Sequence, residues 1–279
     1  MARKKMRAKH VAARSGGLRA AFRKSRRSRQ PALVAYVTAG DPNLKFTEAL
    51  VLALAEAGAD IVELGVPFSD PIADGPVIQR ASERALKRGT SLGGVLKLAE
   101  RIRRKSAIPL VLFSYYNPVL QFGVERFATE ASQAGVDGAL ITDLTPEEAG
   151  GYVKTMRRSR PGGIDTVFLA APTSTAARLR AIARLSRGFV YVISRRGTTG
   201  ARQDVPVEVK ALVRRVRRAT PLPIAVGFGI SRREHVEALA GVADGVVVGS
   251  ALVECCERGR HGRKAIEAAA RLVSELKGV

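Results

Sequence analysis

Short apolar runs alternate with longer amphipathic segments along most of this chain of 279 residues. The runs are continuous in Val, Ile, Leu and Ala, which is typical of parallel strands buried on both faces. Between them, apolar residues recur at a spacing near 3.6, as in helices with one face against a core. The predicted strands are residues 32–38, 60–65, 108–114, 138–142, 166–170, 189–194, 222–226 and 245–248. The clearest predicted helices are residues 46–57, 92–105, 125–134 and 207–218.

This alternation predicts the α/β class and a single (β/α)8 TIM barrel, because about 250 residues suffice for eight strand–helix units. An open, doubly wound sheet is the alternative, and the glycine-rich turns after the late strands favour the barrel. Residues 18–27 carry Leu18, Ala21 and Phe22 at helical spacing, which predicts a short N-terminal helix. We expect the barrel domain to cover residues 16–279.

The positive charge is concentrated at the start of the chain. Residues 1–30 hold 12 of the 47 Lys and Arg and no acidic residue, in a chain of formal net charge +22. Residues 1–15 lack apolar periodicity, so we expect a disordered basic arm there. A polyanion-binding tail and an organelle transit peptide are the alternatives, and we do not expect nucleic acid as a partner.

The rest of the composition bears on the cellular location of the protein and on metal binding. Without a run of 18 apolar residues or an apolar leader, we expect a soluble, cytoplasmic protein with no membrane contact. Cys255 and Cys256 are adjacent, which suits neither a disulfide framework nor a metal site. His10, His235 and His261 have no ligand-like spacing, so no metal is expected.

Two carboxyl groups close to one strand end are the strongest chemical signal. Glu63 lies in the predicted strand at 60–65, and Asp74 follows in a loop rich in Pro, Asp and Gly. The carboxyl end of a barrel strand is where active-site side chains are found. Burial raises the pKa of a strand carboxyl toward neutrality, so the pair predicts an acid/base site.

Six segments, each at a predicted strand end, resemble the tryptophan synthase alpha subunit family in the same order along the chain. They are residues 63–76, 35–42, 115–118, 188–200, 227–231 and 248–251. The resemblance implies a lyase that cleaves indole-3-glycerol phosphate to indole and glyceraldehyde 3-phosphate, a step of tryptophan biosynthesis. It also implies that the helix at residues 18–27 closes the barrel floor.

On this reading Glu63 is the general acid and base of a retro-aldol cleavage. Asp74 stays ionised, accepts a hydrogen bond from the indole N–H, and stabilises the positive charge of the protonated ring. The resemblance further implies that Tyr191 holds the substrate hydroxyl. Without the resemblance, a paired core carboxylate, a turn aspartate and a core tyrosine would be the simpler interpretations.

The substrate phosphate is expected at the ends of the late strands. Gly229, Gly249 and Ser250 each place exposed backbone N–H groups beside a predicted helix start, and Gly200 adds a third edge. Each glycine alone would be an ordinary turn residue, but together they match the usual phosphate position of this fold.

The same alignment of motifs implies an apolar pocket for the indole ring and a closing lid. The expected pocket residues are Tyr36, Phe113, Leu140 and Phe228. Thr199 resembles the threonine of the sixth loop that bonds to the catalytic aspartate when the lid closes.

The resemblance implies a heterotetramer of two alpha and two beta subunits, with pyridoxal phosphate bound only by the beta subunit and no cofactor in this chain. A stand-alone lyase that releases free indole is the closest alternative, and a non-catalytic anion-binding protein is the next. Arg196, Thr198 and Thr145 depart from the family pattern, the first two in the sixth loop and the third in the loop that the resemblance implies for the partner surface.

Overall fold

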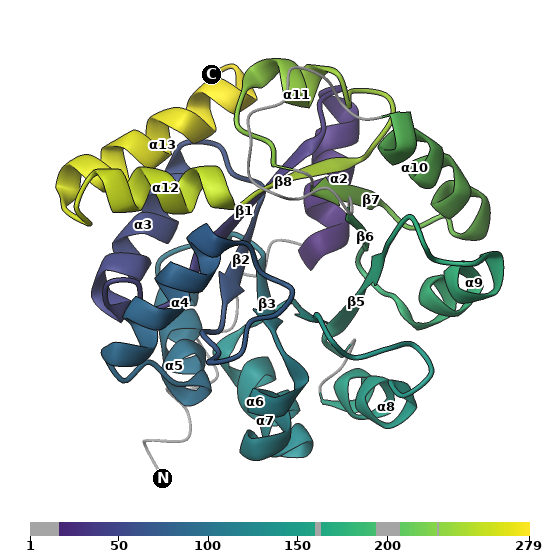
Figure 1. Ribbon diagram of the computed structural model, residues 1–279, viewed down its shortest axis with the longest axis horizontal. Helices are drawn as coiled ribbons and strands as arrows, with labels where there is room; N and C mark the ends of the chain where they lie inside the picture. The colour runs from purple at the N-terminus through teal and green to yellow at the C-terminus, as the bar shows by residue number, and fades with distance from the viewer. Residues whose placement is uncertain (1–16, 160–162, 194–206, 228) are drawn as a thin grey trace, which may run out of the picture.

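A computed structural model shows a closed barrel of parallel strands surrounded by helices, which confirms the predicted TIM barrel (Figure 1). The structure describes residues 17–159, 163–193, 207–227 and 229–279, so the predicted basic arm lies outside it. In barrel order, the strands are β1 (Ala32–Thr38), β2 (Ile61–Gly65), β3 (Leu110–Ser114), β4 (Gly138–Ile141), β5 (Asp165–Ala170), β6 (Val190–Ile193), β7 (Ile224–Gly227) and β8 (Gly245–Val248). The ring closes where β8 pairs with β1.

The helices lie outside the strands, apart from α2 at one end of the barrel. They are α2 (Gly17–Arg27), α3 (Leu44–Glu56), α4 (Pro76–Lys87), α5 (Leu92–Arg103), α6 (Tyr116–Phe122), α7 (Val124–Ala134), α8 (Gly150–Arg158), α9 (Ala176–Leu185), α10 (Val207–Ala219), α11 (Arg233–Glu237), α12 (Ser250–Arg258) and α13 (Arg263–Lys277). The predicted helices at 46–57, 92–105, 125–134 and 207–218 correspond to α3, α5, α7 and α10.

Prolines explain the two largest errors in the predicted strand starts. The third strand was predicted from residue 108 but begins at Leu110, directly after Pro109. The seventh was predicted from residue 222 but begins at Ile224, after Pro223. Proline has no backbone N–H for the strand ladder, so regular pairing starts only after it. The other predicted strand ends differ by one residue or less.

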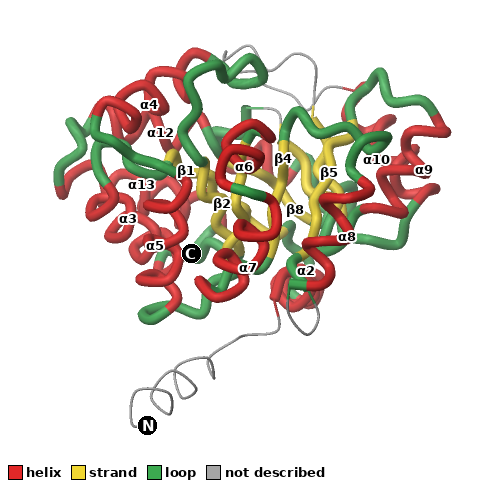
Figure 2. Tube along the Cα trace, turned by 90° about the horizontal axis from the view of Figure 1, so that it is seen from below, coloured by secondary structure: helices red, strands yellow, loops and turns green. Residues whose placement is uncertain are grey.

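Helix α2 closes the amino-terminal end of the barrel, as the resemblance implied (Figure 2). Leu18 and Phe22 are 1% exposed and belong to the interior cluster. Glycines make room for them: a Cβ on Gly138 or Gly188 would lie 2.9 or 2.8 Å from a Leu18 methyl. A Cβ on Gly245 would lie 2.8 Å from the Phe22 ring. Apolar side chains therefore fill the amino-terminal end of the barrel. The carboxyl-terminal ends of the strands, on the opposite side, form its open end.

Side chains alternate along each strand between the barrel interior and the layer beneath the helices. The interior cluster contains the strand residues Ala32, Val34, Ile61, Val111, Leu140, Val167, Tyr191, Ala225 and Val247, together with Phe189, which directly precedes β6. Glu63 is two residues beyond Ile61 and shares its direction, so the apolar interior continues up to its carboxyl group.

We expect Gly245→Ala to destabilise the protein by about 1–3 kcal/mol, because the new methyl group overpacks the contact between β8 and α2. Gly151→Ala in α8 is the matched control, since no atom lies within 4 Å of its Cβ position. That exposed helical change should stabilise by about 0.5–1 kcal/mol. Urea unfolding measures both, and equal stability of the two variants would contradict a tightly packed floor.

Candidate active site

Glu63 places a carboxyl group inside the barrel, where it is fully buried. It lies in β2 and pairs in register with Tyr36 of β1 and Val111 of β3. The residue is 0% exposed, and neither carboxyl oxygen has a hydrogen-bond partner among the described residues. Burial raises the pKa of Glu63 from 4.5 to about 8. A carboxyl group in this position is protonated at neutral pH and can donate a proton.

Asp74 lies in the loop between β2 and α4, two residues before α4 begins. Burial raises its pKa from 3.8 to about 6, and a hydrogen bond from Tyr115 opposes the shift. The Tyr115 hydroxyl donates to Oδ2 of Asp74 at 3.2 Å and accepts from the N–H of Ala73 at 2.9 Å. The loop therefore folds back far enough to desolvate Asp74 in part. The group is still mainly ionised at neutral pH.

Tyr115 is a site residue to which sequence reasoning gave no role. It directly follows β3, and its ring lies 5.0 Å from that of Phe68 at the other end of the Asp74 loop. Its two hydrogen bonds fix the loop above the strand ends. The signal was available, because a tyrosine directly after a barrel strand is at the active-site end.

Tyr36 and Tyr191 are two buried tyrosines that experience the charges of both carboxyl groups. Burial raises the pKa of both hydroxyls well above 10, and the negative charges of Glu63 and Asp74 raise both further. The ionisation of each tyrosine therefore depends on the charge of both carboxyl groups. Gly65 and Gly227 leave space for these rings, since a Cβ at either position would collide with the Tyr36 or the Tyr191 hydroxyl.

Two of the expected indole-pocket residues, Tyr36 and Phe113, are in contact. Their rings meet edge to face with centroids 5.3 Å apart. Leu140 is 0% exposed and belongs to the interior cluster that contains Tyr191, with Phe113 packed against it. Phe228 lies outside the described residues.

Three of the residues expected at the substrate phosphate lie at the start of α12 and just after β7. Gly249 precedes α12 with no side chain capping the helix, and Ser250 is its first residue. A Cβ on Gly249 would lie 3.6 Å from Tyr36, which places this helix start beside the other site residues. Gly229 follows the adjacent strand β7 at φ +88°, with open space where a side chain would be. Unpaired N–H groups at a helix start attract phosphate.

Comparison with known proteins agrees with this geometry. A model of the family "Tryptophan synthase alpha chain" matches residues 22–278. The tryptophan synthase alpha chain of Solibacter usitatus is 55% identical over 233 residues, covering 84% of this chain and 86% of that protein. The one from Geobacter sulfurreducens is 52% identical over 237 residues, covering 85% and 89%.

The chain belongs to the tryptophan synthase alpha chain family. A solved structure described as the tryptophan synthase a2b2 complex from Pyrococcus furiosus contains a chain 45% identical, with a TM-score of 0.83. The match covers 90% of this chain and 99% of that one. Family membership implies lyase activity in tryptophan synthesis.

Four positions of the sixth loop that the sequence analysis named are not among the described residues. Gly200, Thr199, Arg196 and Thr198 lie in 194–206, outside the described residues. Thr145, the remaining departure from the family pattern, donates from its hydroxyl to Glu148 at 3.0 Å.

Metal-binding and membrane features were searched in the described part of the chain. No three His, Cys, Asp or Glu residues there are grouped as a metal site would require. Burial raises the pKa of the Cys256 thiol to about 12, so it is a neutral packing group. No helix among those residues has the length and apolar character of a membrane span.

We expect stability to fall as pH rises from about 6 to about 8, by up to about 1.4 kcal/mol per pH unit. In this window the folded protein keeps the Glu63 proton, whose pKa is about 8, whereas the unfolded chain loses it near 4.5. Below pH 6 Asp74 adds a slope of the same sign. Glu63→Gln should remove the slope between pH 6 and 8.

Urea midpoints measured across this range test the Glu63 titration. Glu48→Gln is the control with the opposite sign, because hydrogen bonds from Lys105 and Arg101 lower the pKa of Glu48. That variant should lose stability at neutral pH and keep the slope between pH 6 and 8. The same slope in Glu63→Gln as in the unmodified protein would show that Glu63 does not titrate there.

Proposed function

We propose that this chain is the alpha subunit of tryptophan synthase and that it cleaves indole-3-glycerol phosphate to indole and glyceraldehyde 3-phosphate. The observation that carries the proposal is the unpartnered Glu63 carboxyl, which shares the open end of the barrel with Asp74. This pairing matches a reaction that moves a proton onto carbon beside a developing positive charge.

The substrate would lie across the strand ends. Its phosphate binds the N–H groups at Gly249 and Ser250 and those near Gly229, as the usual position for this fold suggests. Its indole ring reaches the Tyr36 and Phe113 side with the ring N–H toward Asp74. The glycerol chain then passes Glu63 and Tyr191.

In the first step Glu63 donates its proton to C3 of the indole ring. The ring becomes a cation with the positive charge centred on its N–H, and the Asp74 carboxylate stabilises it. A pKa of about 8 for Glu63 keeps the acid protonated before the step, and a pKa of about 6 for Asp74 keeps the carboxylate charged.

In the second step the Glu63 carboxylate takes the proton of the hydroxyl group next to C3. The oxygen electrons form the aldehyde C=O, the bond between that carbon and C3 breaks, and its electron pair returns to the ring. Indole and glyceraldehyde 3-phosphate leave, and Glu63 is protonated again. Tyr191 is proposed to hold the reacting hydroxyl by a hydrogen bond.

The proposed partner is a tryptophan synthase beta subunit in an alpha2-beta2 assembly. The support is the similarity to a subunit of the Pyrococcus furiosus complex. Pyridoxal phosphate would then be bound by the beta subunit, with no cofactor in this chain. The proposed cytoplasmic location rests on the family alone. Indole release that is equally fast with and without a beta subunit would instead favour a stand-alone lyase.

We predict that Glu63→Gln lowers indole release by about 10²–10⁴-fold, because an amide cannot exchange the proton. Affinity for a non-reactive analogue, an indole joined to phosphate by a propyl chain, should stay within a few fold. Glu48→Gln should retain full turnover, since Glu48 pairs with Arg101 and Lys105 on the helix layer. A Glu63→Gln variant with more than a tenth of normal turnover would refute the assignment.

We predict a bell-shaped pH dependence of kcat/KM, with an acid limb near 6 from Asp74 and an alkaline limb near 8 from Glu63. Tyr115→Phe removes the hydrogen bond that lowers the Asp74 pKa, so only the acid limb should move to higher pH. If the acid limb stayed at the same pH in Tyr115→Phe, the limb would not report the ionisation of Asp74.

A further inference from the structure

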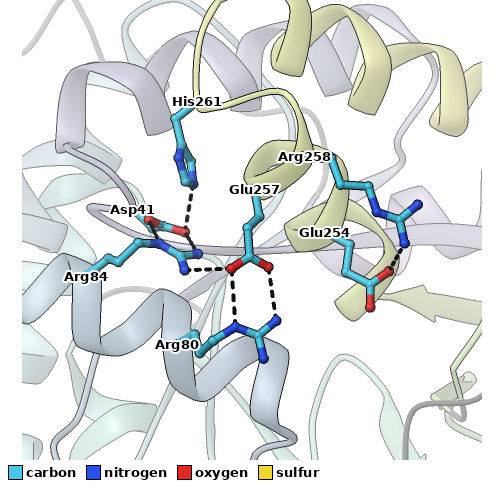
Figure 3. Close-up of polar contacts among 7 residues, drawn as sticks. All are labelled: Asp41, Arg80, Arg84, Glu254, Glu257, Arg258 and His261. Carbon is cyan, nitrogen blue, oxygen red and sulfur yellow. Dashed lines mark hydrogen bonds and ion pairs between the residues drawn. The ribbon is translucent and has the colours of Figure 1, made fainter.

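A network of charged side chains ties α4 to α12 beside the active site. We call it the α4–α12 clamp, and its members are Asp41, Arg80, Arg84, Glu257 and His261 (Figure 3). They come from the loop after β1, from α4, from α12 and from the turn between α12 and α13. None of these residues has a part in the proposed chemistry.

Arg84 is the centre of the clamp. Its Nε and Nη2 donate to the two oxygens of Asp41, each at 2.8 Å, and its Nη1 donates to Glu257 at 3.0 Å. The Asp41 side chain is 4% exposed, so this two-point pair is well shielded from solvent. His261 approaches the same carboxylate at 3.4 Å. Paired, planar contacts of this kind fix orientation as well as distance.

Glu257 binds both arginines of α4. Arg80 donates to its two oxygens at 3.2 and 3.0 Å, in addition to the bond from Arg84. The hydrogen bond from Arg80 is the main reason that the pKa of Glu257 is lowered, so the carboxylate is charged at neutral pH. One side chain of α12 thus holds two successive turns of α4.

Both clamped helices begin at the active site. Helix α4 starts at Pro76, directly after Asp74 and Gly75, and Arg80 lies one turn further on. Helix α12 starts at Ser250, and Glu257 lies two turns further on. A shift of α4 against α12 would therefore move Asp74 relative to the start of α12.

The apolar contact between the two helices is narrow. A separate small cluster joins Val77 and Ala81 of α4 to Val253 of α12 and to Tyr36 of β1. Small apolar side chains give little resistance to sliding, because their packing is not directional. The hydrogen-bonded ion pairs of the clamp are directional, so they fix how α4 lies against α12.

We propose that the α4–α12 clamp positions Asp74 relative to the phosphate-binding start of α12, so that Glu257 and Arg80 are positioning residues for the indole half of the substrate. This inference rests on the proposed function. The distance between the phosphate and the ring nitrogen is fixed by the substrate, so the protein must hold its two contacts at a matching separation. The clamp is the direct polar link between the helices that carry them.

The kinetic consequence differs for the two ends of the substrate. Loosening the clamp leaves the start of α12 intact, so ground-state binding through phosphate persists. It misplaces Asp74, whose charge is needed most when the ring becomes a cation. A loss in the transition state alone lowers kcat and leaves KM nearly unchanged.

Glu257→Gln tests the clamp, with Glu254→Gln as the matched control. Glu254 is on the same helix and pairs with Arg258 at 3.2 Å, without a bond to α4 (Figure 3). A misplacement of about 1 Å costs up to about 100-fold, so we expect a kcat about 5- to 20-fold lower in Glu257→Gln. KM should stay within about twofold, and Glu254→Gln should match the unmodified enzyme.

Arg80→Gln removes only the hydrogen bonds from Arg80 to Glu257, so kcat should fall less than in Glu257→Gln. The double variant should be no slower than Glu257→Gln alone, because the two residues act through one contact. A kcat unchanged in Glu257→Gln, an equal loss in Glu254→Gln, or a raised KM at constant kcat would each overturn the positioning role.

A binding measurement separates this inference from the proposed function. Calorimetric titration with inorganic phosphate should show the same phosphate affinity in Glu257→Gln, in Glu254→Gln and in the unmodified chain, because the start of α12 stays intact. A phosphate affinity that falls in Glu257→Gln but not in Glu254→Gln would reject the proposed clamp, because the substitution would then have disturbed the start of α12 and not only Asp74. Absence of indole release by the unmodified chain, with and without a beta subunit, would reject the proposed function instead.

Discussion

The burial of one uncompensated carboxyl group is the constraint on which the rest of the site depends. Glu63 is enclosed by the barrel and has no hydrogen-bond partner in the part of the chain that the structure describes. Such a group costs stability when ionised, so it remains protonated and available as an acid. The surrounding fold makes this possible, because Leu18 and Phe22 close the barrel floor. The same burial that opposes ionisation keeps the proton on Glu63 at neutral pH, so that it is available for transfer.

Asp74, the second carboxyl group, is ionised where Glu63 is protonated because the groups around it differ. Asp74 is partly desolvated, but the Tyr115 hydroxyl donates to it and keeps its pKa near 6. The protein thus keeps a neutral acid and a charged carboxylate in one site by giving them different surroundings. Each depends on a different part of the fold: Glu63 on the strand ladder, Asp74 on the loop and on the helix that follows it.

Features with local causes could be predicted from the sequence. Strand positions follow from continuous apolar runs, and the functional interest of Glu63 and Asp74 follows from a carboxyl group at a strand end beside a Pro-rich loop. The contacts between distant residues could not be predicted. Tyr115 is 41 residues from Asp74, and Arg84 is 173 residues from Glu257. Sequence spacing carries no information on such pairs, whereas the closed barrel brings their elements together.

The most direct test is the titration of the Glu63 carboxyl itself in the unliganded protein. Carbon-13 NMR of the protein labelled at glutamate side-chain carboxyls would follow it, with Glu63→Gln identifying the resonance by its absence. The account predicts a resonance that titrates near pH 8, far above those of the exposed glutamates. A Glu63 resonance that titrates near 4.5 would contradict it, because the group would then be ionised at neutral pH and unable to start the cleavage as an acid.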